Sequence, residues 1–201
     1  TEFRAFTIAE VLITLGIIGI VAAITIPTLI NNYQKTQYVT QLKKAYAATN
    51  QALKQMAADN GCIDDLKCTG LFDTGSSQFS LGSALVKYFN VAKNCKVNKN
   101  ESCWASETNQ NYDGSFTGTN PTYDKSDCYK FVTADGVSFF IYNYRNNCVT
   151  DGTNGSTNFS TGRTGNMKQT CAELHIDVNG LKKPNVIGRD TFVFYITNGK
   201  G

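Results

Sequence analysis

The stretch that decides the fold is Val11–Ile30, VLITLGIIGIVAAITIPTLI, twenty residues without a charge. As a helix rising ~1.5 Å per residue, it would extend about 30 Å, which is the hydrocarbon thickness of a bilayer. The stretch therefore predicts a membrane-spanning helix. A cleaved secretory signal fits less well, because its apolar core is shorter and this run passes directly into a helix-forming segment. A fully buried helix of a soluble protein is the remaining alternative.

The composition of the whole chain excludes several classes of protein. Of its 201 residues, 41% are hydrophobic and 17% are charged, and the formal net charge is +3. These values exclude a disordered chain and a polytopic membrane protein. The nearly balanced charge, without a dense basic run, argues against specific nucleic-acid binding. With a single histidine, the chain has no His-cluster metal site and no basis for most histidine catalysis.

One carboxylate stands at the start of the apolar stretch. Glu10 directly precedes Val11, and the residues from Phe6 to Ala9 are also uncharged. A charge at the edge of a membrane segment is a functional-site hypothesis whose partner must be named. If the chain is cleaved before Phe6, the new α-ammonium of a neighbouring subunit would be that partner. The alternative is an incidental interfacial glutamate that reaches the lipid headgroups.

The residues Ala5–Glu10, AFTIAE, followed by the apolar helix, resemble the class III signal of type IV pilins and type II secretion pseudopilins. In that family a prepilin peptidase cleaves before a Phe and N-methylates it, and a Glu stands four residues later. Phe6 and Glu10 have this spacing, and the resemblance covers residues 5 to 58. It implies cleavage between Ala5 and Phe6, although the family usually has Gly before the cut. The residues TEFRA would then be the end of a leader, with Arg4 on the cytoplasmic side.

Three helix-weakening residues lie inside the apolar stretch, namely Gly16, Gly19 and Pro27. The last two fall where many type IV pilins carry a helix-breaking glycine and proline. A proline removes a backbone donor and clashes with the carbonyl four residues earlier, and each glycine costs up to about 1 kcal/mol in a helix. Local unwinding in an assembled fibre is one interpretation. Ordinary membrane-helix composition is the other.

The helical pattern continues beyond the apolar stretch in an amphipathic form. Residues 31–60 contain neither Gly nor Pro, and one stripe recurs at three- and four-residue steps: Leu42, Ala45, Thr49, Ala52 and Met56. Such a stripe predicts a helix with one face packed on a domain. Gly61 would end it, so we expect one helix over residues 6–60.

The rest of the chain predicts a head with a small helix and four strands. SLGSALVKYFN indicates the helix, and the strand patterns are CYKFVT, VSFFIYNY, AELHIDVNG and TFVFYIT. The first two strands flank a turn with Asp-Gly chemistry. We therefore expect an α+β fold in which the long helix, half membrane and half amphipathic, packs on a roughly four-stranded antiparallel sheet, as in pilins. Polar segments around 105–127 and 149–170 would be surface loops.

All seven cysteines lie beyond residue 60, which suggests an oxidising compartment for the head. Metal binding is disfavoured because the chain has no Cys-x-x-Cys pair. Seven is odd, so at least one thiol is left over or is paired with another chain. Many pairings are open. The favoured set is Cys62 with Cys68, Cys95 with Cys103, and Cys148 with Cys171, which leaves Cys128 outside it.

The sequence contains no catalytic constellation, so we expect no enzyme. His175 falls on the polar face of an alternating strand, which predicts a solvated histidine rather than a general base. A calcium site is conceivable where Asp177, Asn179 and Asp190 converge, and major pseudopilins carry a calcium loop near the C-terminus. The run lacks the bidentate Glu of an EF-hand, and basic residues crowd it. A turn stabilised by Asx hydrogen bonds is the favoured interpretation, and we expect no cofactor.

These observations divide the chain into a leader remnant (1–5), a transmembrane and filament-core helix (6–30), an amphipathic helix (31–60) and a disulfide-bearing head (61–201). The resemblance implies a subunit that inserts once in the inner membrane, meets prepilin peptidase and the assembly machinery, and polymerises with itself into a cell-surface filament. A type IV pilin is the first interpretation and a type II secretion pseudopilin the second. From another class, the alternative is a monomeric, membrane-anchored extracytoplasmic enzyme or binding domain.

Overall fold

A single helix, α1, covers Ile8–Asp59. The structure is a computed structural model and describes residues 7–63, 65–97, 102–105, 110–111, 128–144, 148 and 170–198. The chain divides into two compact units, Thr1–Thr40 and Gln41–Gly201, so α1 contributes residues to both. The expected helix over residues 6–60 thus agrees with α1 to within two residues at its start and one at its end. Phe6 lies outside the described residues.

The C-terminus of α1 is closed by a glycine in the left-handed region. Gly61 has φ 72°, and its N–H donates to the carbonyl of Ala58 over 2.9 Å. The N–H of Cys62 donates to the carbonyl of Ala57 over 2.8 Å. These two bonds form a Schellman motif, which satisfies carbonyls that a helix end otherwise leaves open. Gly61 therefore ends the helix where the sequence predicts.

Within the second unit, α1 packs one stripe of small and apolar side chains. Ala45, Thr49, Ala52 and Met56 are all buried, whereas Leu42 is half-buried. The ring of Tyr46 lies 5.6 Å from that of Phe194, which belongs to strand β7 (Thr191–Thr197). The predicted amphipathic stripe is therefore the face of α1 that packs in this unit.

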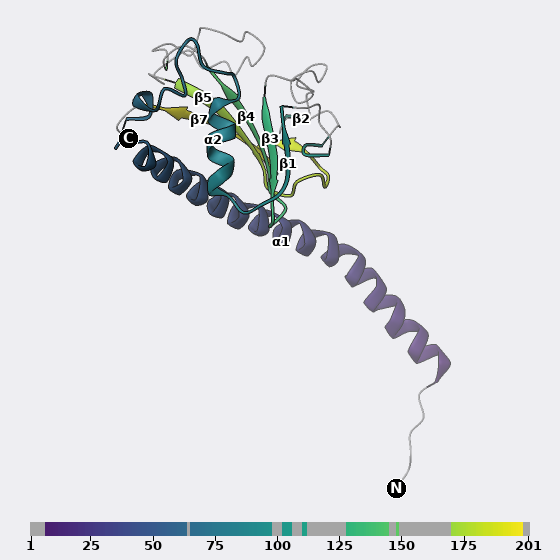
Figure 1. Ribbon diagram of the computed structural model, residues 1–201. Helices are drawn as coiled ribbons and strands as arrows, with labels where there is room; N and C mark the ends of the chain where they lie inside the picture. Colours follow the sequence, from purple (N-terminus) through teal and green to yellow (C-terminus); the bar gives the residue numbers. More distant parts are fainter. Residues whose placement is uncertain are drawn as a thin grey trace. The chain divides into compact units, whose positions relative to one another are not determined.

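The sheet of the second unit has seven strands in the order β1-β3-β4-β5-β7-β6-β2 (Figure 1). The other strands are β1 (Val91–Lys96), β2 (Gln110–Asn111), β3 (Tyr129–Thr133), β4 (Ser138–Asn143), β5 (Thr170–Asp177) and β6 (Val186–Ile187). The central strands β3, β4, β5 and β7 pair antiparallel and coincide with the four predicted strands. The sheet is larger than predicted, and it is mixed, because β6 pairs in parallel with both β2 and β7.

Short helices cover one face of the sheet. Helix α2 (Ser80–Leu85) contacts β3 and β4, and the 3-10 turn η2 (Val86–Tyr88) follows it (Figure 1). A side chain placed on Gly82 would overlap the ring of Tyr129, so glycine sets the approach of α2 to β3. Phe89 then packs against both Phe131 and Phe139, with ring centroids 5.3 and 5.0 Å away, and these two rings stack on each other at 4.9 Å. The apolar core of the head lies between these elements and the sheet.

The opposite face of the sheet is also buried, which corrects the prediction for β5. Every residue of β5 is buried, and His175 has no exposed surface. The expected solvated histidine is therefore wrong, and Glu173 and Asp177, which share its face of the strand, are buried as well. The ring of Phe140 lies 5.1 Å from that of His175, and Trp104 lies 6.4 Å from it on the same face. Aromatic packing thus covers side chains that the alternation alone assigns to solvent.

Candidate functional site

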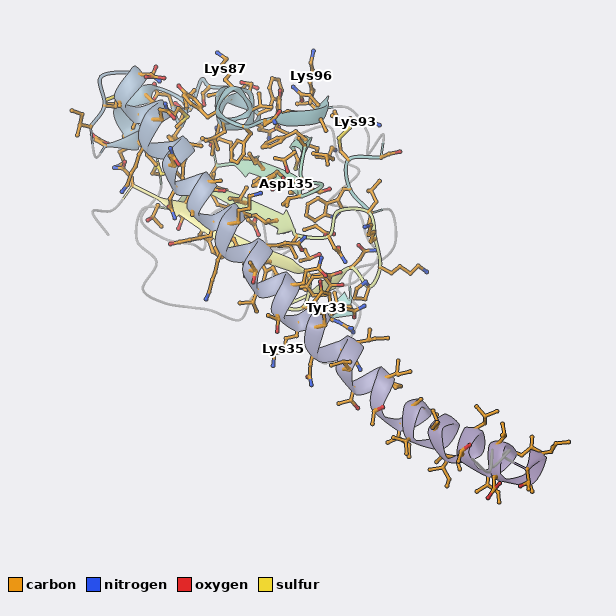
Figure 2. All side chains as sticks on the ribbon, turned by 90° about the horizontal axis from the view of Figure 1, so that it is seen from below. Tyr33, Lys35, Lys87, Lys93, Lys96 and Asp135 are labelled. Atoms are coloured by element: carbon orange, nitrogen blue, oxygen red, sulfur yellow. A yellow bond between two sulfur atoms is a disulfide. The ribbon has the colours of Figure 1, made fainter. Side chains whose placement is uncertain are left out.

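The first half of α1 is an apolar helix whose side chains are exposed. Between Ile8 and Ile30 only Ala22 is half-buried, and side chains such as Ile8, Ile24 and Leu29 are 81%, 70% and 71% exposed. Figure 2 shows side chains projecting from all sides of this segment. The helix is long and apolar enough to span a membrane or to act as a signal anchor. An exposed surface of this size needs lipid or other protein around it.

Two of the three threonines in the stretch Val11–Ile30, Thr14 and Thr25, are satisfied by the helix itself. The hydroxyl of Thr14 donates to the carbonyl of Val11, and that of Thr25 donates to the carbonyl of Val21, both over 2.9 Å. A hydroxyl that bonds to its own backbone adds little cost in lipid, because no polar hydrogen is left without an acceptor. These two polar side chains are therefore compatible with an apolar environment.

Glu10 forms a reciprocal pair with Thr7 at the start of α1. The Oε2 atom of Glu10 accepts hydrogen bonds from the backbone N–H and from the hydroxyl of Thr7, both over 2.8 Å. The backbone N–H of Glu10 donates to the hydroxyl oxygen of Thr7 over 3.3 Å. This is a capping box, in which two orphan N–H groups of the first turn are satisfied by side chains. Glu10 thus has a structural role within its own chain, which the sequence analysis did not consider.

The three helix-weakening residues leave α1 unbroken. The helix runs through Gly16, Gly19 and Pro27, and no described atom lies within 4 Å of a side chain placed on either glycine. Packing against the described residues therefore does not require these two glycines. The space beside them would let a second helix approach closely. The expected unwinding concerns a fibre and stays a prediction.

The cleavage junction and the first residue of the expected mature chain, Ala5 and Phe6, lie outside the described residues. Their processing and methylation therefore stay predictions from the sequence. Of the expected assembly site, Phe6 and Glu10, the structure places Glu10.

The three candidate calcium ligands lie close together, and hydrogen bonds join them within the turn: Asp177, Asn179 and Asp190. The N–H of Asn179 donates to Oδ1 of Asp177 over 3.2 Å, which is the predicted Asx turn. The carboxylate of Asp190 accepts from the N–H groups of Asn185 and Val186 over 2.8 and 2.6 Å, and from Nδ2 of Asn179 over 3.0 Å. Among the described residues there is no group of three or more His, Cys, Asp or Glu side chains suited to a metal ion. These hydrogen bonds therefore hold the loop closed through its own side chains and backbone.

Burial of this carboxyl pair has an electrostatic consequence. Asp177 is 1% exposed and Asp190 has no exposed surface. Burial, and next the neighbouring Asp190 carboxylate, raise the pKa of Asp177 to about 8. A protonated Asp177 at neutral pH relieves the repulsion between the two groups. We therefore expect ionisation of Asp177, as the pH rises through about 8, to restore this repulsion.

A second cluster of polar side chains, which the sequence pattern does not predict, links β5 to the end of β4. The Nε2 atom of His175 lies 3.1 Å from Oε1 of Glu173. The hydroxyl of Tyr144 donates to Oε2 of Glu173 over 3.1 Å, and burial and the Glu173 charge raise the pKa of Tyr144. His175 has no exposed surface, so these three side chains are part of the packing on this face of the sheet.

The head contains three disulfides, which are the three pairs favoured from the sequence. They join Cys62 to Cys68, Cys95 to Cys103, and Cys148 to Cys171. Cys128 forms none of these bonds and is buried. The first two disulfides close short loops, with sequence separations of 6 and 8, and the described part of α1 contains no cysteine.

Comparison with known protein families, with curated protein sequences and with solved structures gives no match to this chain.

Proposed function

We propose that the chain is a structural subunit of a helical extracellular filament, of the type IV pilin kind. The observation that carries the proposal is the exposed apolar half of α1 with one carboxylate at its first turn. The Phe6–Glu10 spacing and the disulfide-bearing α+β head support the same proposal. A membrane anchor alone needs an apolar helix, but it does not need a charge at this position.

The proposed mechanism has three steps. The subunit inserts in the inner membrane through its apolar helix, prepilin peptidase cleaves between Ala5 and Phe6, and an ATP-driven machine extracts it into a fibre. The fibre core would consist of packed N-terminal helices. Because lipid is already apolar, packing would gain more from close contact and from charge pairing than from the hydrophobic effect. We expect the core to form from a subunit that is already helical.

Glu10 would have two successive partners in this mechanism. In the free subunit it caps the helix through Thr7. In the fibre its carboxylate would pair with the α-ammonium of Phe6 in a neighbouring subunit. A buried, unpaired ammonium is costly, so pairing would favour one register between adjacent helices.

The deciding experiment is intact-mass analysis of subunits from sheared cell-surface material, combined with electron microscopy. We expect long fibres whose subunit begins at N-methylated Phe6. Assembled fibres that retain Thr1 would contradict the processing step. Fibres that form only on overexpression would favour a type II secretion pseudopilin. Absence of fibres, with activity in the membrane fraction, would favour a monomeric anchored enzyme or binding domain.

A further inference from the structure

The first disulfide of the head differs from the other two in exposure. Cys68 is exposed, whereas the cysteines of the other two bonds are 2% exposed or less: Cys95, Cys103, Cys148 and Cys171. Its partner Cys62 is 3% exposed and follows the Schellman motif at the end of α1. A disulfide opens when a thiolate reaches one of its sulfur atoms, so access limits the rate. Of the two cysteines in this disulfide, Cys68 is therefore the one that a thiolate from solvent can reach.

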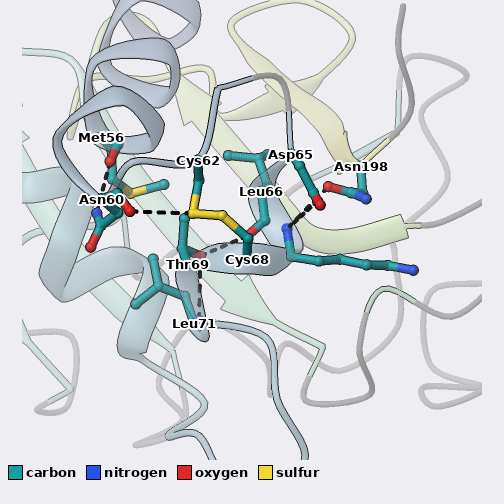
Figure 3. The surroundings of a disulfide bond; sticks show 10 residues. Met56, Asn60, Cys62, Asp65, Leu66, Cys68, Thr69, Leu71 and Asn198 are labelled. Carbon is teal, nitrogen blue, oxygen red and sulfur yellow. Dashed lines mark hydrogen bonds between the residues drawn. A yellow bond between two sulfur atoms is a disulfide. The ribbon is translucent and has the colours of Figure 1, made fainter.

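The loop that this disulfide closes holds the end of a strand distant in sequence. Cys68 lies in the 3-10 turn η1 (Leu66–Thr69), which Asp65 caps. The N–H of Lys67 donates both to Oδ1 of Asp65 over 2.9 Å and to the side-chain oxygen of Asn198 over 3.1 Å (Figure 3). Asn198 directly follows β7, so the loop fastens the C-terminal end of that strand.

Beyond the loop, a separate set of hydrogen bonds anchors the chain. The carbonyl oxygen of Leu71 accepts from the hydroxyls of Ser76 and Ser80 over 2.9 and 2.6 Å, and from Nδ2 of Asn143 over 2.8 Å. These donors belong to the following loop, to α2 and to β4. None of these bonds depends on the disulfide. Movement of η1 is therefore limited after its C-terminal end by the bonds to Leu71, and before its N-terminal end by the cap of α1.

We propose that the Cys62–Cys68 disulfide is a reduction-sensitive clasp that controls the end of β7. A dithiol, either a small molecule or a thioredoxin-like oxidoreductase, is the reductant. Its thiolate attacks Sγ of Cys68, the S–S bond breaks, and Cys62 leaves as a thiolate that takes up a proton. The second thiol of the reductant then displaces Cys68 and becomes part of the reductant's own disulfide. With the loop open, η1 moves, the Lys67–Asn198 bond is lost, and the end of β7 frays.

The test is graded reduction of the full-length protein in detergent with dithiothreitol, followed by alkylation and peptide mass analysis. We expect Cys62 and Cys68 to become alkylated at least about tenfold faster than the other four disulfide cysteines. Hydrogen exchange at the amides from Ile196 to Asn198 should rise at least about tenfold at that stage, while amides of β3 and β4 stay protected. No variant is needed for this measurement.

A matched variant separates the hydrogen bond from the disulfide. Asn198→Ala removes the acceptor but leaves the disulfide in place, so exchange at the end of β7 should already be fast in the oxidised protein. Reduction should then add little. The proposal is overturned if another disulfide opens first, or if selective reduction leaves exchange at the end of β7 unchanged. It is equally overturned if exchange rises uniformly across the sheet, because the effect is then global.

Discussion

The Nζ atom of Lys44 lies 2.8 Å from Oδ2 of Asp135, so an ion pair joins α1 to the turn between β3 and β4. The hydroxyl of Thr133 donates to Oδ1 of the same carboxylate over 2.5 Å. Asp135 is labelled in Figure 2. Burial raises the pKa of Asp135. Hydrogen bonds from Lys44 and Thr133 together lower it by more, so the net shift of the pKa is downward. The turn is therefore held on two sides by one carboxylate.

We expect Asp135→Asn to lower the free energy of unfolding by up to about 1 kcal/mol, because the side chains of Lys44 and Asp135 are 70% and 42% exposed and water screens their charges. The lowered pKa means that this contribution is present above the unfolded value of 3.8 and is lost as pH falls through the folded value. Urea unfolding at neutral and acidic pH measures it. Asp73→Asn, at an exposed position, is the control, and an equal loss in both variants would contradict the role of the pair.

Gly82→Ala should destabilise the head by about 1–3 kcal/mol, because the added methyl overlaps the side chain of Tyr129 and forces α2 away from β3. Gly75→Ala is the matched control, since no described atom lies within 4 Å of its added methyl. Thermal unfolding of the two variants gives the comparison. If Gly82→Ala is as stable as the control, the close approach of α2 does not matter for stability.

Asp177→Asn should remove a pH dependence of stability. Because the folded pKa of Asp177 is raised to about 8 from 3.8, its favourable contribution is complete below 3.8 and is lost as pH rises through about 8. The variant should therefore gain at least about 1 kcal/mol on the parent between about pH 5 and pH 8. Denaturation across this range tests it, and parallel curves for parent and variant would show that Asp177 ionises normally.

Glu10→Val should abolish or slow fibre assembly, because the α-ammonium of a neighbouring Phe6 would lose its partner. Membrane insertion should stay intact, because the substitution removes a charge from the bilayer edge. Thr7→Ala removes only the hydroxyl of the capping box and should cost about 0.5–2 kcal/mol of helix stability. The measurement is fibre yield beside membrane-fraction yield. Normal fibres from Glu10→Val would make Glu10 an incidental charge. Equal assembly defects in both variants would assign Glu10 to capping alone.

The elements found from the sequence are those with strong local signals. The Asp-Gly turn and flanking apolar runs predict β3 and β4. Short spacings favour the first two disulfide pairs, and the third is favoured because it joins the end of one predicted strand to the start of the next. The missed strands lack such signals. β2 and β6 have two residues each, and β1 is polar with two register shifts against β3. Pairing with distant segments defines these strands, so a local pattern does not predict them.

The candidate site shows the same limit. Glu10 was identified from the apolar run beside it, and the pattern Thr-x-x-Glu before that run could also have predicted the capping box. His175 was misplaced because alternation gives the polar face of a strand, but not whether another layer covers that face. Trp104, which contacts the ring of His175, lies in a segment with no pattern of its own.

The carbonyl of Leu71 has a consequence for how the head tolerates mutation. Its three donors are side chains, but the acceptor is an atom of the main chain, which every amino acid carries. No substitution at position 71 can delete the acceptor, so this position should accept exchange by residues that keep the backbone path. Losing any one donor leaves the other two in place. Mutation can therefore remove these hydrogen bonds only at the donors Ser76, Ser80 and Asn143, and not at the Leu71 carbonyl.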